Sequence, residues 1–108
     1  MERLIITYGG YFERFLETLS YKEIIKLNYI ISLLETSDRM PAKFIKYIRD
    51  GLFELRMEYS SNIYRVFFIF DDDNIVVLFN GFQKKTQKTP LKEIELALEI
   101  KEAYYADK

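Results

Sequence analysis

Hydrophobic residues recur along this chain with a strand period in some segments and a helix period in others. Residues 3–8, RLIITY, are rich in β-branched side chains and precede two glycines, which predicts a short strand. Helical spacing then predicts one helix in residues 10–19 and a second from Tyr21 to about Glu35, opened by a capping box of Ser20 and Glu23. The two helices should form a hairpin and bury Phe12, Phe15, Leu16, Leu19, Ile24, Leu27, Ile31 and Leu34.

The middle of the chain has the pattern of a β-meander. Residues 37–41 form a loop, and residues 44–51, FIKYIRDG, are ambiguous between a helical turn and an irregular basic segment. Three strands follow, joined by the polar turns YSSN and DDDN. Their predicted bounds are about 52–58, 63–70 and 75–83.

The end of the chain predicts one more helix. Thr89 would be its N-cap and Pro90 its first residue, and the helix should run to about Tyr105. The order βααβββα indicates an α+β fold with a mostly antiparallel sheet, in a single domain of residues 1–108.

Strand register decides which side chains share a face of the sheet. A two-residue turn at Ser60-Ser61 sets Arg56 opposite Arg65 and gathers on one face the apolar residues Phe53, Leu55, Met57, Tyr64, Val66, Phe68 and Phe70. A two-residue turn at Asp72-Asp73 would add Ile75, Val77 and Phe79 to this core face. The opposite face then has an apolar end that the last helix or a partner protein must cover, made of Leu52, Phe67, Ile69, Val76 and Leu78.

The other end of that second face is polar and net positive. It carries Glu54, Arg56, Arg65, Asn80, Phe82 and Lys84. Like charges directly opposite one another destabilise a sheet, so the facing arginines need an explanation. Either Glu54 bridges them in an ordinary ion network, or two guanidiniums and a lysine converge on an anion, and the fork of arginine suits phosphate.

Composition narrows the chemistry that this polar end can perform. The chain has no cysteine and no histidine, which excludes thiol nucleophiles, the usual structural zinc sites and an imidazole base. The acidic run Asp71–Asp73 fits a solvated turn better than a metal site, and no metal or cofactor is expected. No apolar run reaches the roughly 18 residues of a membrane span and no secretion signal is evident, so we expect a cytoplasmic protein without a membrane partner.

Charge is unevenly distributed along the chain. The formal net charge is −1, but residues 39–92 carry ten basic and six acidic side chains. Within this region KKTQKTPLK, residues 84–92, has four lysines and no acid. A general polyanion binder is therefore not expected, whereas a local basic site is.

Four segments of the second half carry a family resemblance: GLFELR, IYRVFFIF, IVVLFNGFQKKTQKTP and EIELALE. In this order and spacing they resemble the HigB-like, phage-derived-protein-like branch of the RelE/ParE toxin superfamily, by motif over about residues 51–105 and by element order over the whole chain. The resemblance implies a small α+β ribonuclease-like fold. It also implies the toxin half of a bacterial toxin–antitoxin pair. RelE and HigB relatives cut messenger RNA at the ribosome, and ParE relatives poison DNA gyrase, so fold alone does not choose between them.

The resemblance also implies roles for individual residues. Arg65 matches the position that binds the scissile phosphate, Arg56 a neighbouring basic position, and Lys84-Lys85 the basic pair after the last strand. Attack by a ribose 2′-hydroxyl would use Lys84, Lys85 or Glu54 as its base, and the sequence does not rank these three. RNA contacts would come from Phe82 and Tyr59 by stacking, from Lys88 and Lys92 with phosphates, and from Tyr104 or Tyr105 as the C-terminal tyrosine that stacks on a base.

The implied partners are messenger RNA, the ribosome and a cognate antitoxin of helix-turn-helix type. Two other functions remain open from the sequence: a non-catalytic, ParE-like inhibitor of gyrase, and a toxin homologue that has lost its activity. The converging cations favour the ribonuclease, because a pure binding module does not need them. The slightly acidic balance and the absence of histidine depart from the pattern of this family and concern activity rather than fold.

Overall fold

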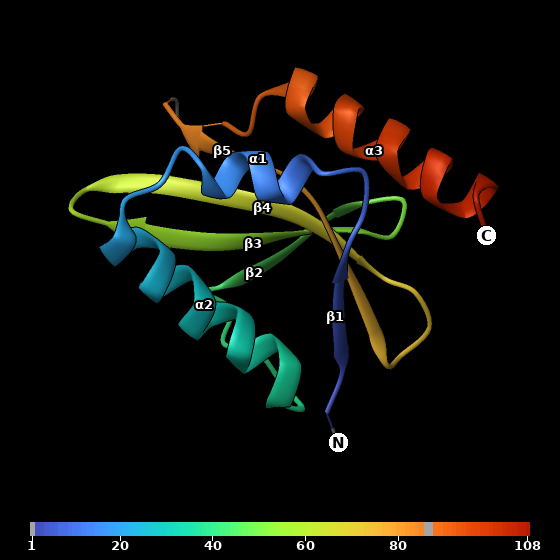
Figure 1. The fold of residues 1–108 in the computed structure, drawn as a ribbon, viewed down its shortest axis with the longest axis horizontal. Helices are drawn as coiled ribbons and strands as arrows, with labels where there is room; N and C mark the ends of the chain where they lie inside the picture. Colours follow the sequence, from blue (N-terminus) through green and yellow to red (C-terminus); the bar gives the residue numbers. More distant parts are fainter. Residues whose placement is uncertain (1, 86–87) are drawn as a thin grey trace.

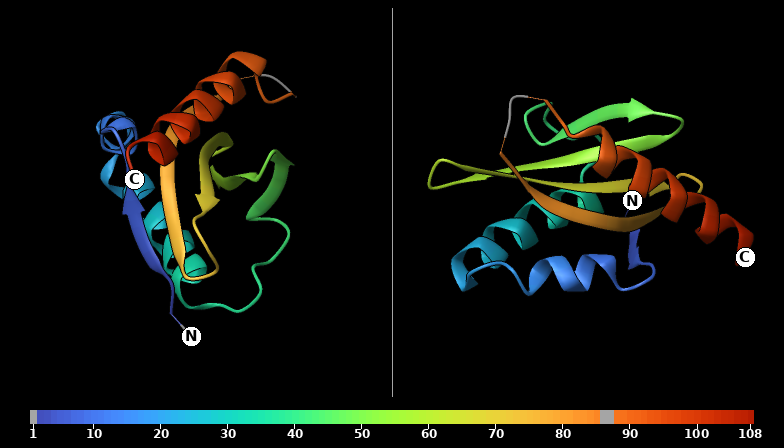
Figure 2. Two further views of the ribbon diagram at one scale, coloured as in Figure 1. Left: turned by 90° about the vertical axis from the view of Figure 1, so that its right-hand side faces the viewer. Right: turned by 90° about the horizontal axis from the view of Figure 1, so that it is seen from above.

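A five-stranded sheet with helices on both faces forms the molecule (Figure 1). The computed structural model describes residues 2–85 and 88–108. The elements are β1 (Leu4–Thr7), α1 (Tyr11–Leu16), α2 (Tyr21–Thr36), β2 (Ile45–Arg49), β3 (Leu52–Tyr59), β4 (Asn62–Phe70), β5 (Ile75–Lys84) and α3 (Leu91–Ala106). Helices α1 and α2 pack on one face and α3 on the other (Figure 2). This arrangement confirms the predicted α+β class.

The strand order is β1-β5-β4-β3-β2, with β1 parallel to β5 and all other pairs antiparallel. The sequence interpretation of residues 44–51 was wrong, because β2 lies within this segment and pairs with β3. Asp50 and Gly51 connect the two strands with φ angles of 51° and 79°. An Asp-Gly pair with two positive φ angles is the preferred two-residue hairpin turn, so a signal for this strand was present in the sequence.

The helical hairpin buries its apolar side chains against one face of the sheet. The predicted capping box is confirmed: Ser20 Oγ accepts from the Glu23 backbone N–H, and the Glu23 carboxylate accepts from the Ser20 N–H. Glu23 also accepts a hydrogen bond from the hydroxyl of buried Tyr64, which links α2 to β4. Of the predicted core positions of α2, Ile24 and Ile31 are only half-buried, and Ile30 is fully buried in their place.

The predicted pairing of β3 with β4 is confirmed. Arg56 lies opposite Arg65, and Ser60-Ser61 form the turn. The predicted start of β5 at Ile75 is confirmed, but the predicted two-residue turn at Asp72-Asp73 was wrong. The connection from β4 spans residues 71–74 and closes with a hydrogen bond from the Asp71 N–H to the Ile75 carbonyl, so that Phe70 lies opposite Val76 and the predicted register is shifted by one residue. Consequently the core cluster beneath α1 and α2 contains Val76 and Leu78, and the cluster beneath α3 contains Ile75, Val77 and Phe79.

A β-bulge in β5 returns the end of this strand to the predicted faces. The register shifts between Val66 and Phe68 of β4, after which Arg65 lies opposite Phe82 and Ile63 opposite Lys84. A bulge inserts one extra residue and so exchanges the two faces from that point onward. Phe82 and Lys84 therefore reach the face that carries the arginines.

Helix α3 covers the apolar end of the second face, through Ala97 and Ile100. Its N-cap is Pro90 and no side chain caps it, so the prediction of Thr89 as N-cap was wrong. Its far end is tied to the β4–β5 turn, where Asp71 Oδ2 accepts from Tyr104 Oη at 2.6 Å and from Lys108 Nζ at 2.7 Å. Among the described residues, no helix has the length and apolar character needed to cross a membrane.

Candidate active site

Glu54 bridges the two facing arginines. Its Oε1 atom lies 3.1 Å from Arg65 Nε and 3.5 Å from Arg56 Nε. The charges are close enough for ion pairs, but neither Nε–H forms a regular hydrogen bond with the oxygen. The bridging ion network that the sequence left open is therefore present, and it offsets the repulsion between the two guanidiniums.

Glu54 is held by residues far apart in the sequence. Its side chain is fully buried, and its second oxygen, Oε2, accepts a hydrogen bond of 2.9 Å from Thr89 Oγ1. Thr89 lies just before α3, so its hydroxyl supports the carboxylate instead of capping the helix. The carboxylate is thus fixed from two sides, by guanidiniums on one oxygen and by a hydroxyl on the other.

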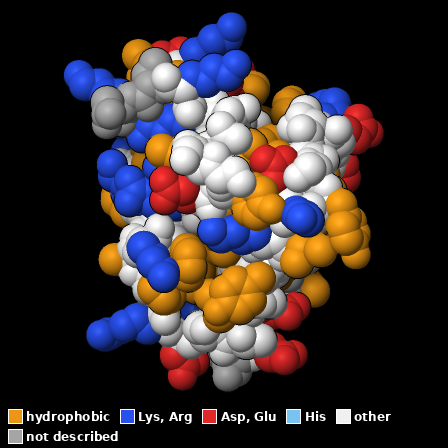
Figure 3. All heavy atoms as spheres, turned by 90° about the vertical axis from the view of Figure 1, so that its left-hand side faces the viewer, with side chains coloured by type: hydrophobic (Ala, Val, Ile, Leu, Met, Phe, Trp, Pro, Cys, Tyr) orange, Lys and Arg blue, Asp and Glu red, His pale blue; other side chains and the backbone are white. Residues whose placement is uncertain are grey.

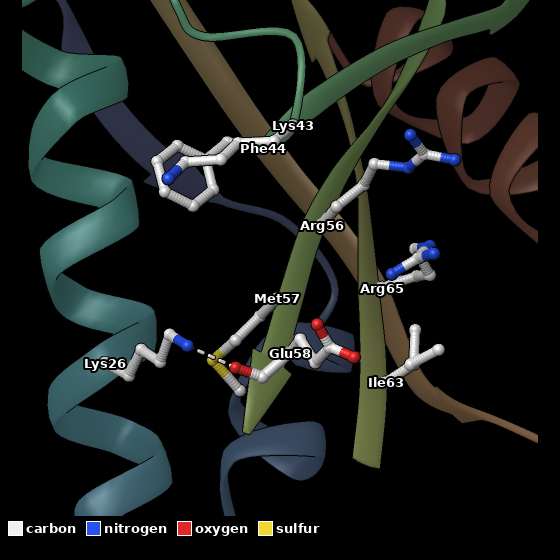
Figure 4. Close-up of a pocket in the computed structure, with 8 residues that line it drawn as sticks. All are labelled: Lys26, Lys43, Phe44, Arg56, Met57, Glu58, Ile63 and Arg65. Carbon is white, nitrogen blue, oxygen red and sulfur yellow. Dashed lines mark hydrogen bonds between the residues drawn. The ribbon is translucent and has the colours of Figure 1, made fainter. Parts of the chain in front are cut away.

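Arg65 is buried, whereas Arg56 is partly exposed. Burial lowers the pKa of Arg65, and nearby Arg56 lowers it further, while Glu54 raises it. An arginine still keeps its proton under these conditions. Arg65 donates from Nη1 to the Tyr64 carbonyl at 3.1 Å, and a guanidinium has five N–H donors, so these contacts leave donors for a ligand. Figure 4 shows both guanidiniums on the side of the β3–β4 hairpin that faces α3.

Lys84 completes the basic group from β5. Burial lowers its pKa, and Arg65, Arg56 and Lys46 lower it further, against an opposing effect of Glu54. Lys84, Lys46, Arg56 and Lys88 line one pocket of about 340 Å³, together with Thr89. A half-buried lysine crowded by cations is a candidate proton acceptor.

Lys46 is a member of this group that the sequence interpretation did not identify. It lies on β2 directly opposite Glu54, and β2 was not predicted as a strand. The Asp-Gly turn would have revealed the strand, and strand alternation would then have set Lys46 on the arginine face.

Other predicted site residues lie elsewhere. Lys85 lines a different pocket with Arg14 and Gln83. Lys92 is exposed on the first turn of α3. Phe82, opposite Arg65, is half-buried and packs on Phe67 with ring centroids 5.6 Å apart.

The three candidate tyrosines are also away from the arginines. Tyr59 packs against the core cluster beneath α1 and α2. Tyr104 hydrogen-bonds Asp71, and Tyr105 stacks edge-on against Tyr104 at 5.3 Å. Asp71 follows Arg65 by six strand residues, or on the order of 20 Å, so the C-terminal tyrosines are not brought to the basic group.

Basic side chains are concentrated on one part of the molecular surface. Figure 3 shows the end of the molecule that carries the turn between β3 and β4, and Lys and Arg side chains gather along its upper and left margins. The formal net charge of the chain is −1, so the basic character is local. Such an arrangement can bind an anion at one site without making the whole protein a polyanion binder.

Comparison with known families agrees with the geometry. A family model described as phage-derived protein Gp49-like (DUF891) matches residues 14–102, which is most of the chain. The chain belongs to this family. Gp49-like proteins are a family of RelE/HigB-like toxins, and membership implies an antitoxin partner. A search of curated proteins finds no match.

The region that matches the Gp49-like family model includes every element that contributes a side chain to the basic group around Arg56, Arg65 and Lys84. β2, β3, β4, β5 and the start of α3 all lie within residues 14–102. Positively charged side chains that are fixed in advance can stabilise charge as it develops on a phosphoryl group. The group thus has the composition expected of a site for a phosphodiester.

Proposed function

We propose that this Gp49-like protein is the toxin of a type II toxin–antitoxin system and that it cleaves messenger RNA at the translating ribosome. The observation that carries the proposal is the convergence of Arg56 and Arg65 on one face of the sheet, beside a lysine whose pKa is lowered. A surface that only bound a partner protein would not need two guanidiniums held by a buried carboxylate. The site of action would be the cytoplasm.

In the proposed reaction, a ribose 2′-oxygen attacks the adjacent phosphorus and the bond to the 5′-oxygen breaks. The products are a 2′,3′-cyclic phosphate and a 5′-hydroxyl, which takes up a proton as it leaves. Arg65 and Arg56 stabilise the charge that develops on the phosphoryl oxygens, an effect worth roughly 3 kcal/mol per donor. Neither metal nor cofactor takes part in this scheme.

Lys84 is the base that we propose for the 2′-hydroxyl proton. It lines the same pocket as Arg56, and the surrounding cations favour its neutral form, which can accept a proton. Lys85 lines a different pocket, and both oxygens of Glu54 are already engaged. We therefore assign Glu54 the role of orienting the arginines.

RNA would also contact residues around this centre. Phe82 presents part of its ring beside Arg65 and could support a base, and Lys88 lines the pocket of Lys84 and would contact a phosphate. The further partners of this function are the ribosome and an antitoxin, which we expect to carry a helix-turn-helix by analogy with the superfamily.

Expression in bacteria that lack the antitoxin tests the proposal. We expect growth arrest and new 5′ ends inside translated messages with the wild-type protein. Arg65→Ala and Lys84→Gln should produce neither, whereas Arg49→Ala should behave as wild type, because Arg49 is an exposed arginine of β2 paired only loosely with Asp50 at 3.9 Å. Thermal unfolding of each purified variant controls for folding. Growth arrest with gyrase-linked DNA breaks and intact messages would contradict the proposal and favour a ParE-like toxin.

A further inference from the structure

A second basic pocket adjoins the candidate active site, at the edge of the sheet. It has a volume of about 460 Å³ and includes Lys26, Lys43, Phe44, Glu58 and both arginines in its lining. Figure 4 shows Lys26 and Phe44 on the α2 side of β3 and the arginines on the other side. The pocket therefore passes around the edge of β3.

The edge of β3 is not covered by β2 beyond Leu55, because β2 does not extend along the second half of β3. The pairing of the two strands starts at Ile45 opposite Leu55. Beyond this pair, the Arg56 N–H donates to the Phe44 carbonyl at 2.8 Å, and Lys26 Nζ donates to the Glu58 carbonyl. These contacts use backbone groups that an added strand would need, so the pocket is poorly suited to bind a peptide by strand addition.

The lining combines positive charge with apolar walls. Four cations, from Lys26, Lys43, Arg56 and Arg65, surround one acid, Glu58. Apolar surface comes from Phe44, Met57 and Ile63. A ligand that fits both features carries an anionic group and a flat apolar group, and the volume lies within the range of ordinary small-molecule sites. A nucleotide has this chemistry.

Arg56 connects this pocket to the smaller one that holds Lys84, because it lines both. A ligand that extends past Arg56 from one pocket into the other would occupy both. A single nucleotide is too small to do this, whereas a polynucleotide strand is long enough. We infer that the edge pocket binds the nucleotide next to the cleaved one in single-stranded RNA, with Lys26 and Lys43 contacting phosphate and Phe44 contacting the base. This inference rests on the proposed function and adds a substrate subsite to it.

The test is binding of a fully 2′-O-methylated RNA oligonucleotide, which cannot be cleaved, to the purified protein at several salt concentrations. Lys43→Gln should weaken binding several-fold at low salt and reduce the slope of log K against log salt by about 0.7, the value for one phosphate contact on a single strand. Glu58→Gln should strengthen binding, because it removes the one acid of the pocket. Phe44→Leu should weaken binding about fivefold or more with an unchanged slope, because it removes a stacking ring and no charge.

The matched control is Arg39→Gln. Arg39 is exposed in the same loop as Lys43 and is not part of the pocket lining, so the same change of charge should alter neither affinity nor salt slope. Equal effects of Arg39→Gln and Lys43→Gln would overturn the subsite and indicate only long-range attraction. If a nucleoside monophosphate binds as tightly as the oligonucleotide, the inference that one RNA strand occupies both pockets is overturned.

Three further results separate this inference from the proposed function. Messages cut in cells by wild type and by Lys43→Gln alike, with no loss of RNA affinity in the variant, would overturn the subsite alone. Loss of antitoxin binding in Lys43→Gln with unchanged RNA affinity would overturn it in favour of a protein ligand. Absence of message cleavage in cells would instead contradict the function, whatever the binding result.

Discussion

Glu54 is the residue that lets two arginines face each other across adjacent strands. One of its oxygens lies within 3.5 Å of both guanidiniums, and the other accepts from Thr89. Strand alternation predicted that these charged residues share a face. The role of Thr89 as a hydrogen-bond donor to Glu54 could not be predicted, because this contact joins residues 35 positions apart and depends on how α3 packs on the sheet.

Thr89→Val should loosen the carboxylate while keeping the size of the side chain. We expect the free energy of unfolding to fall by about 1.5–3 kcal/mol, as for hydrogen bonds to charged groups. RNA cleavage at 25 °C should fall about tenfold, or about 1.4 kcal/mol in the barrier. Thr89→Ser keeps the hydroxyl and should restore both quantities. A serine variant as impaired as the valine variant would show that the hydroxyl is not the important feature.

The pH dependence of cleavage tests the role of Lys84. If neutral Lys84 is the base, the rate should rise with pH and level off above its lowered pKa. Arg56 is one of the cations that lower this pKa, so Arg56→Gln should move the inflection to higher pH, besides lowering the maximum rate. Rates measured from pH 5 to pH 10 on folded protein give the comparison. An inflection that stays in place in Arg56→Gln would exclude Lys84 as the titrating group.

At the scale of elements, local signals predicted most of the fold, and the failures have identifiable causes. Strand β2 was missed because its five residues alternate poorly, although the following Asp-Gly turn was visible in the sequence. The faces of β5 were predicted wrongly at its start and correctly at its end, because the turn is longer than two residues and a bulge compensates. Turn length and bulges depend on tertiary packing, so the sequence pattern alone does not reveal them.

Gly81 shows why β5 needs a small residue beside the bulge. A Cβ atom added there would lie 2.4–2.8 Å from the ring of Phe15, which is buried in the core. Gly81→Ala should therefore lower the free energy of unfolding by about 1–3 kcal/mol, the usual cost of overpacking. Urea unfolding measures the change, and exposed Gln83→Ala on the same strand is the control. Equal stability of Gly81→Ala and wild type would mean that α1 can shift freely on the sheet.

At the scale of the whole molecule, composition predicted the kind of site but not its extent. The absence of histidine and cysteine excluded imidazole and thiol chemistry, and the basic middle of the chain indicated where a site for an anion lies. Lys26, Lys43 and Lys46 reach the site region from α2, from the loop before β2 and from β2. Their convergence is a property of the fold, and no local pattern marks them as neighbours.

Two carboxylate–tyrosine contacts, Glu23 with Tyr64 and Asp71 with Tyr104, should make the free energy of unfolding depend on pH. Hydrogen bonds from Tyr64 to Glu23, and from Lys108 and Tyr104 to Asp71, lower the pKa values of both carboxyls. A group with a lowered pKa in the folded state stabilises the fold above its unfolded pKa, of about 4, and loses this effect as the pH falls. The same contacts raise the pKa values of Tyr64 and Tyr104 to about 12, so their contribution should be lost as the pH rises from 10 to about 12.

Urea unfolding as a function of pH tests both limits. Stability should decline below about pH 4 and again above about pH 10, the unfolded values for carboxyl and phenol groups. The double variant Glu23→Gln with Asp71→Asn should show a flatter curve in both ranges. A curve as steep as that of wild type would mean that other groups dominate the pH dependence.

The most direct test of the central claim is cleavage of a message on purified ribosomes with one ribose changed. The wild-type protein should cut an all-ribose message and leave a 5′-hydroxyl and a 2′,3′-cyclic phosphate. A message with a single 2′-deoxynucleotide on the 5′ side of the cut should stay intact at that position, because the attacking 2′-oxygen is absent. Cleavage of the deoxy-substituted message at the same bond, or no cleavage of the all-ribose message, would contradict the account.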